Sequence, residues 1–230
     1  MVWCDRFAQE TFLKLKDEFG IGLLVETGSY IGHSAELYAH YFTGVITIEI
    51  DTKYAEAAKQ RLARYPNVKV FNASSDDIIS ILNPKEPIFF FLDAHDFNNM
   101  VVDNWIVRRE LRAIGQRDNC IIAIHDYDNG ELGHIQNGDA KLDWGMVGDL
   151  LQQVNPNFRY YTNRKEDCDI VTEENVSQLP IQMDEVIYHV IRHSINGGGD
   201  ATKYRGILYA VPRELDLSKY KLREYGNRAN

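Results

Sequence analysis

The chain has 230 residues, of which 44% are hydrophobic and 26% charged, enough to bury one ordinary globular core. Its 34 acidic and 25 basic residues give a net charge of −9 without a dominant Lys/Arg cluster, which argues against a nucleic-acid partner. Three cysteines without CxxC spacing argue against a disulfide framework, and the absence of a signal-like or membrane-spanning apolar run leads us to expect a cytoplasmic protein.

Strand-like and helix-like segments alternate along residues 21–124. Helical spacing of apolar residues predicts a first helix at 6–19. Apolar runs predict strands at 21–25, 45–50, 68–71, 88–92 and 120–124, the last beginning with a core thiol at Cys120. Helices are predicted between them at 33–42, 53–65, 75–82 and 100–114. This alternation is typical of an α/β fold with a doubly wound, mostly parallel sheet.

The pattern is less regular after residue 124. We expect a loop at 130–143, a helix at 144–154 and two late strands at 158–161 and 206–211, the second of them antiparallel. The sheet would then have seven strands within a single domain, residues 1–230. The insertion at 162–205, with a helix or strand at 185–192, is a candidate lid or homodimer arm, and residues 219–230 form a polar tail.

A glycine turn follows the first predicted strand, in the run VETGSYIGHS at residues 25–34. Glycines let the backbone approach a ligand, and the amides that open the next helix face the same site. Glu49, which ends the second strand 21 residues after Gly28, has the offset of an acid that binds ribose hydroxyls. Tyr30 replaces a glycine of the dinucleotide fingerprint, and Glu26 suits a cationic ligand, so the run favours S-adenosylmethionine over NAD.

Residues 25–35 resemble the first motif of catechol-type O-methyltransferases, E-x-G-x-Y-x-G-x-S, and residues 48–51 are similar to their second-strand motif. The segments NASSD at 72–76 and FLD at 91–93 resemble their adenine-side and strand-four motifs. The HDY at 125–127 is closer to the D-D-Y of macrocin-type sugar O-methyltransferases, and DAHD at 93–96 has no lysine where catechol-type enzymes carry a base.

This resemblance implies a class I S-adenosylmethionine-dependent methyltransferase with a Rossmann-like fold. It implies that Glu26 and its turn hold the methionine end of the cofactor, Glu49 the ribose, and Ser74 and Ser75 the adenine edge. The full set of expected cofactor contacts is Glu26, Gly28, Ser29, Tyr30, Gly32, Ser34, Glu49, Ile50, Asp51, Ser74, Ser75 and Asp93.

Asp93 and Asp126 end strands that should be neighbours, so their carboxylates are candidate ligands of Mg²⁺, which prefers oxygen. Such an ion would lower the pKa of an acceptor hydroxyl. His125 or His95 either completes this metal site or acts as a general base. Without a metal, a side-chain base is needed; His95 is the first candidate and His125 the second. Alternatively, Asp93 only contacts the cofactor and Asp126 only forms a turn or helix cap.

We expect methyl transfer to a hydroxyl of a small molecule, such as a sugar or natural-product intermediate. One alternative is a non-catalytic nucleoside-binding module that binds a partner through residues 162–205. Another is a different enzyme on this scaffold, cephalosporin-hydroxylase-like or an aminopropyl transferase. Trp144, Tyr160 and Tyr161 either line the acceptor pocket or belong to the core.

Overall fold

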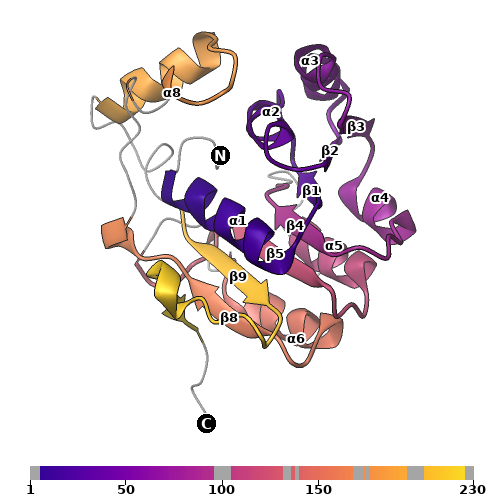
Figure 1. The fold of residues 1–230 in the computed structure, drawn as a ribbon, viewed down its shortest axis with the longest axis vertical. Coiled ribbons are helices and arrows are strands. Elements are labelled where there is room, and N and C mark those ends of the chain that lie inside the picture. Colours follow the sequence, from indigo (N-terminus) through magenta and orange to yellow (C-terminus); the bar gives the residue numbers. More distant parts are fainter. Residues whose placement is uncertain are drawn as a thin grey trace.

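The computed structural model describes residues 6–95, 105–131, 136–137, 140–167, 174, 177–195 and 205–225. It has one central eight-stranded sheet with the order β10-β8-β9-β5-β4-β1-β2-β3 and helices on both faces (Figure 1). The predicted α/β fold is therefore confirmed. Within the described residues, no helix combines the length and the apolar character that crossing a bilayer requires.

Five strands are mutually parallel: β1 (Leu23–Thr27), β2 (Gly44–Glu49), β3 (Val68–Asn72), β4 (Ile88–Leu92) and β5 (Cys120–His125). Three antiparallel additions extend the β5 side: β9 (Ile207–Val211), β8 (Arg159–Thr162) and β10 (Arg223–Glu224). Thr27 pairs with Leu92, and Leu92 pairs with Ile124. This register brings the residues that follow β1, β4 and β5 to one edge of the sheet.

Side chains of the central strands alternate between two hydrophobic cores. Phe89 and Phe91 pack with the first helical layer, whereas Phe90 and Leu92 pack with the second, as the two-residue period of a strand requires. The first layer contains α1 (Arg6–Phe19), α2 (His33–Ala39) and α3 (Thr52–Leu62). The second contains α4 (Ser75–Ile81), α5 (Ile106–Ile114) and α6 (Trp144–Val154). Cys120 is fully buried in the second core, as predicted.

The sheet has eight strands instead of the predicted seven. The additional strand is β10, in the segment that the sequence indicated as a polar tail. Leu215, Leu217 and Leu222 are buried in the first core and hold this segment against the sheet. Charged residues separate these leucines in the sequence, which hides their common role. A short hairpin, β6 (Gln136–Asn137) and β7 (Ala140–Lys141), also interrupts the predicted loop.

The insertion contributes helix α8 (Glu185–Ile195), and the segment just before this helix is tied to α2 and α3 by hydrogen bonds and ion pairs. Glu36 is fully buried and accepts hydrogen bonds from Arg61, Arg64 and the backbone amide of Gln182. Asp184 accepts from Arg61 and lies 2.8 Å from Nε2 of His33. Burial raises the pKa of Glu36, but these donors outweigh it and lower the pKa. The described part of the insertion is thus attached to the helix that follows the glycine turn.

Candidate active site

The glycine turn after β1 has the backbone conformation that its sequence indicates. Gly28 has φ 77°, and a Cβ placed there would lie 2.6 Å from the carbonyl oxygen of Asp93, so only glycine fits this contact. Tyr30 has φ 49°, an uncommon value for a residue with a side chain. The turn therefore packs directly on the backbone of the loop that follows β4. The motif at residues 25–35 thus contacts the motif at residues 91–93.

Glu26 lies buried beneath this turn. Its Oε2 accepts a hydrogen bond of 2.6 Å from Thr47 Oγ1, which in turn lies 2.5 Å from Ser29 Oγ. Burial raises the pKa of Glu26 to about 8, because the hydroxyls of Thr47 and Ser34 only partly compensate for lost water. A buried carboxyl of this kind gains most from a cationic ligand.

Glu49 stands beside the turn at the end of β2. Its two carboxylate oxygens each accept one backbone hydrogen bond of 2.9 Å, from Tyr30 and from Asp51. Asp51 caps α3 by accepting from the amides of Lys53 and Tyr54, so its carboxylate has a structural role. Ile50 leaves 70% of its surface exposed, which makes it an apolar surface next to the acid.

Ser74 and Ser75 begin α4 at the same edge, and their hydroxyls contact protein groups. Ser74 Oγ donates to Asp76, while Ser75 Oγ donates to Glu110 Oε1 over 2.6 Å. Glu110 is fully buried on α5, and burial raises its pKa to about 7. Sequence reasoning missed Glu110. Its position in the apolar stripe of Val107, Leu111 and Ile114 was the signal that could have found it.

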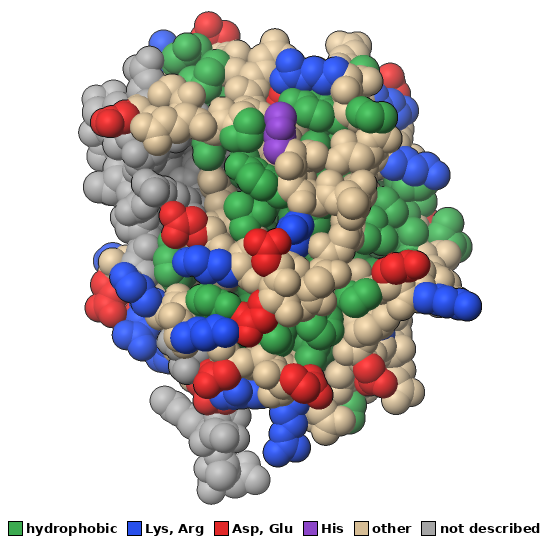
Figure 2. Space-filling view, in the orientation of Figure 1, with side chains coloured by type: hydrophobic (Ala, Val, Ile, Leu, Met, Phe, Trp, Pro, Cys, Tyr) green, Lys and Arg blue, Asp and Glu red, His purple; other side chains and the backbone are tan. Residues whose placement is uncertain are grey.

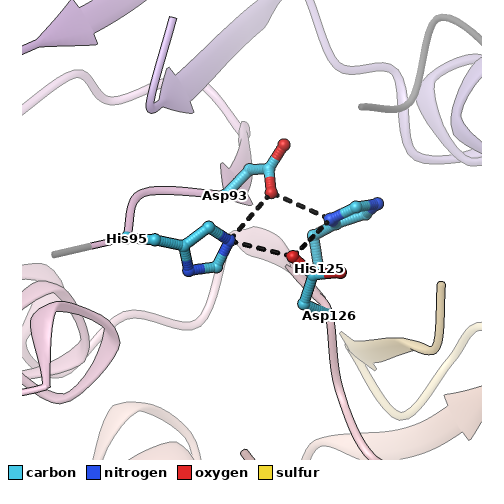
Figure 3. Close-up of side chains that lie close together, drawn as sticks. All are labelled: Asp93, His95, His125 and Asp126. Atoms are coloured by element: carbon cyan, nitrogen blue, oxygen red, sulfur yellow. Dashed lines mark hydrogen bonds and ion pairs between the residues drawn. The ribbon is translucent and has the colours of Figure 1, made fainter. Parts of the chain in front are cut away.

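At the ends of β4 and β5, two carboxylates and two imidazoles point toward one another (Figure 3). His125 Nδ1 lies 2.8 Å from Asp93 Oδ1 and 3.5 Å from Asp126 Oδ2. His95 Nε2 lies 3.0 Å from Asp126 Oδ2 and 3.3 Å from Asp93 Oδ1. One ligand atom of each residue lies within 4.8 Å of all the others. We call these four residues the Asp/His cluster.

Charge compensation within the Asp/His cluster is strong. Burial raises the pKa of Asp93 and of Asp126, but His125 outweighs it and lowers both. Burial lowers the pKa of His95, yet hydrogen bonds to Asp126 and Asp93 raise it to about 9. Without a bound metal, this shift favours the protonated form of His95 at neutral pH. The role of His95 as the base of a metal-free enzyme stays a prediction.

Arg205, at the end of the insertion, is a further member of the site that the sequence did not indicate. Its Nε lies 3.1 Å from Asp126 Oδ1. The next residue must be glycine, because a Cβ at Gly206 would lie 1.8 Å from the carbonyl oxygen of Tyr127. Asn163, fully buried, donates to the carbonyl of Arg205 and accepts from the amide of Ile207. These contacts at the end of the insertion position the guanidinium group of Arg205 beside the carboxylate of Asp126.

The remaining candidates lie elsewhere. Tyr161 belongs to the first core, and Trp144 packs edge-on against Tyr160. A cavity of about 540 Å³ includes Tyr160 and Arg159, at the opposite edge of the sheet from the Asp/His cluster. Asp96, the last residue of the DAHD run, lies outside the described residues.

Scans against protein-family models and against curated proteins find no match. Among solved structures, this chain is 16% identical to the plantazolicin methyltransferase BamL, with a TM-score of 0.53. That protein was crystallised with a desmethyl-plantazolicin analogue and S-adenosylhomocysteine (SAH). The match covers 92% of this chain and 85% of that one. An O-methyltransferase from Bacillus cereus in complex with SAH is 20% identical with a TM-score of 0.51, covering 88% and 80%. At these identities the likeness shows the fold, which is that of class I methyltransferases.

Proposed function

We propose that this chain, which has the fold of class I methyltransferases, transfers the methyl group of S-adenosylmethionine to a hydroxyl of a small molecule. The observation that carries the proposal is the contact between the glycine turn and Asp93. It joins the strand ends that carry Glu26 and Glu49 to a cluster of carboxylates and imidazoles. Methyl transfer requires such a junction, because cofactor and acceptor oxygen must meet in line.

We assign each of these residues to one part of the cofactor. The buried Glu26 would pair with the ammonium group, and the carboxylate of Glu49 would accept the ribose hydroxyls. Ile50 would cover one face of the adenine, whose edge would lie near Ser74 and Ser75. The hydroxyls of both serines are engaged with acids, so we expect the backbone of this segment to make the contact.

The Asp/His cluster would act on the acceptor. Its two carboxylates fit a divalent cation, since all four ligand atoms lie within 4.8 Å of one another and are largely buried. A cation bound there would lower the pKa of an acceptor hydroxyl and favour its reactive, deprotonated form. Asp93 and Asp126 would hold the ion, and the backbone contact of Asp93 with Gly28 would keep it near the methyl group.

Charge argues for a small acceptor instead of a nucleic acid. The net charge is −9, and Figure 2 shows acidic and basic side chains interspersed over the face that it presents. A protein that binds a phosphate backbone usually gathers Lys and Arg on one face. The acceptor we propose is a hydroxylated sugar or natural-product intermediate.

Calorimetry with S-adenosylmethionine and SAH, with EDTA and with added divalent cations, tests the proposal. We expect one molecule of either ligand to bind per chain, and NAD to give no heat of binding. Release of SAH should then appear when a panel of hydroxylated sugars and phenols is supplied with S-adenosylmethionine. Failure of both cofactor forms to bind a folded protein would refute the proposed function.

A further inference from the structure

We propose that Asp93, His95, His125 and Asp126 together bind one first-row transition-metal ion, such as Mn²⁺, Fe²⁺ or Co²⁺, in preference to Mg²⁺. The sequence predicted Mg²⁺ on Asp93 and Asp126, with His125 or His95 either completing the site or acting as the base. The metal site itself follows from the geometry of the four side chains. Only the role of the ion in methyl transfer rests on the proposed function.

The spacing of the cluster fits a single ion. Ligand atoms bound at about 2.1 Å to one ion lie about 3 Å apart when they are adjacent in an octahedron. The observed separations between imidazole nitrogens and carboxylate oxygens are 2.8, 3.0, 3.3 and 3.5 Å. The ligand atoms therefore need only small movements to close around an ion between them.

The ligand types decide which ion is favoured. Mg²⁺ binds oxygen ligands and retains several waters, whereas imidazole nitrogen suits first-row transition-metal ions such as Fe²⁺ and Zn²⁺. Mn²⁺ and Co²⁺ belong to the same first-row series, in which affinity for mixed nitrogen and oxygen sites rises from Mn²⁺ to Cu²⁺. Here half of the protein ligands are imidazoles, and both imidazoles direct a nitrogen to the same point as the carboxylates (Figure 3). Two carboxylates also supply the charge that balances a divalent ion.

Neighbouring groups hold the ligands in this orientation. Arg205 binds Oδ1 of Asp126 and leaves Oδ2 facing the imidazoles. The backbone amide of Asp93 donates to Thr27 Oγ1 over 3.2 Å, and Phe91 packs edge-on against the ring of His125. Supporting contacts of this kind are typical of metal sites, where they fix ligand direction and raise affinity.

The test is a titration of the metal-stripped protein with Mn²⁺ or Mg²⁺ alone, followed by electron paramagnetic resonance and calorimetry. We expect Mn²⁺ to bind at least about tenfold more tightly than Mg²⁺, with electron spin-echo modulation from two imidazole nitrogens. His95→Asn and His125→Asn should each weaken Mn²⁺ binding about tenfold or more and reduce the preference over Mg²⁺. His40→Asn is the matched control, because His40 is exposed and its imidazole hydrogen-bonds to Tyr65, away from the cluster.

Equal affinity for the two ions, or no binding of either, would overturn the inference and leave the cluster as a network neutralised by protons and Arg205. Unchanged Mn²⁺ binding in both variants would overturn it as well. Melting temperature and SAH binding show whether each variant is folded. SAH calorimetry also separates the two proposals, because a protein that binds SAH but prefers Mg²⁺ keeps the proposed function and loses this inference.

Discussion

The candidate active site has two ends, a proposed cofactor end at Glu26 and a proposed chemical end at the Asp/His cluster, and their carboxylates are in opposite electrostatic states. At the cofactor end, Glu26 is buried among hydroxyl groups, and its pKa rises to about 8. At the chemical end, Asp93 and Asp126 face histidines and Arg205, and the pKa of both is lowered. Among the described residues, Glu26 is hydrogen-bonded to a hydroxyl, whereas Asp93 and Asp126 are paired with histidines and Arg205. A ligand with an ammonium group therefore complements Glu26. At the Asp/His cluster, a metal ion would have to replace the protons of the histidines.

The largest effect should come from the chemical end. Asp126→Asn removes one charged ligand of the proposed ion and leaves the nucleoside pocket intact, so turnover should fall by about 100-fold or more. SAH affinity, measured by calorimetry, should stay within about threefold. EDTA should have the same selective effect on the unmodified protein, and a divalent cation should restore activity. Equal losses of turnover and SAH affinity would mean that the two ends are not separable.

A pH titration of SAH affinity should report on the proposed cofactor end instead of the chemical end. Only the carboxylate form of Glu26 pairs with an ammonium, and below pH 8 this group must first lose its proton. SAH affinity should therefore rise by about tenfold per pH unit between pH 6 and about 7.5, then level off near the pKa of about 8. Glu26→Gln should bind more weakly, with little pH dependence over the same range. A wild-type affinity that is flat with pH would show that Glu26 does not meet the ammonium.

Glu49→Ala should weaken SAH binding by about 1–3 kcal/mol, because the ribose hydroxyls lose their acceptor. The same variant also removes the hydrogen bonds that Glu49 accepts from the backbone amides of Tyr30 and Asp51. Calorimetry measures the change, and Glu56→Ala, an exposed acid on α3 paired with Lys59, is the control. Unchanged SAH affinity in a folded Glu49 variant would remove this residue from the cofactor site.

The smallest effect is expected at Arg205, which touches Asp126 from outside the cluster. Arg205→Gln should lower turnover by about tenfold, as substitutions of supporting residues at metal sites commonly do, without changing SAH affinity. Arg205→Lys should retain more activity, since it keeps the positive charge. A glutamine variant as impaired as Asp126→Asn would instead place Arg205 among the groups that contact the acceptor.

The sequence predicted the cofactor end more completely than the chemical end. Glu26, Gly28 and Tyr30 lie within one short run, and the register of β1 with β2 places Glu49 beside them. Local periodicity and turn chemistry are sufficient for such a site. Arg205 reaches Asp126 only because β9 returns antiparallel to β5, a pairing between residues about 80 positions apart that no local pattern specifies.

Helix existence was equally easy to predict, whereas buried charges were not. The boundaries of α1, α4 and α6 agree closely with the expected ones because their apolar residues follow the helical period. Glu36 and Glu110 are fully buried although their residue type predicts exposure. Their partners come from α3, α4 and the insertion, so only the assembled fold identifies them.

The short strand β10 also affects how the molecule behaves in concentrated solution. It covers the outer side of β8, whose sequence RYYT would otherwise present unpaired amides and carbonyls with aromatic side chains. Exposed edges of this composition pair readily with other chains, and a two-residue strand bearing Arg and Glu is a poor template for such pairing. A chain shortened before Leu222 should therefore keep the sheet edge that carries the Asp/His cluster but aggregate more readily, and light scattering during refolding would reveal the difference.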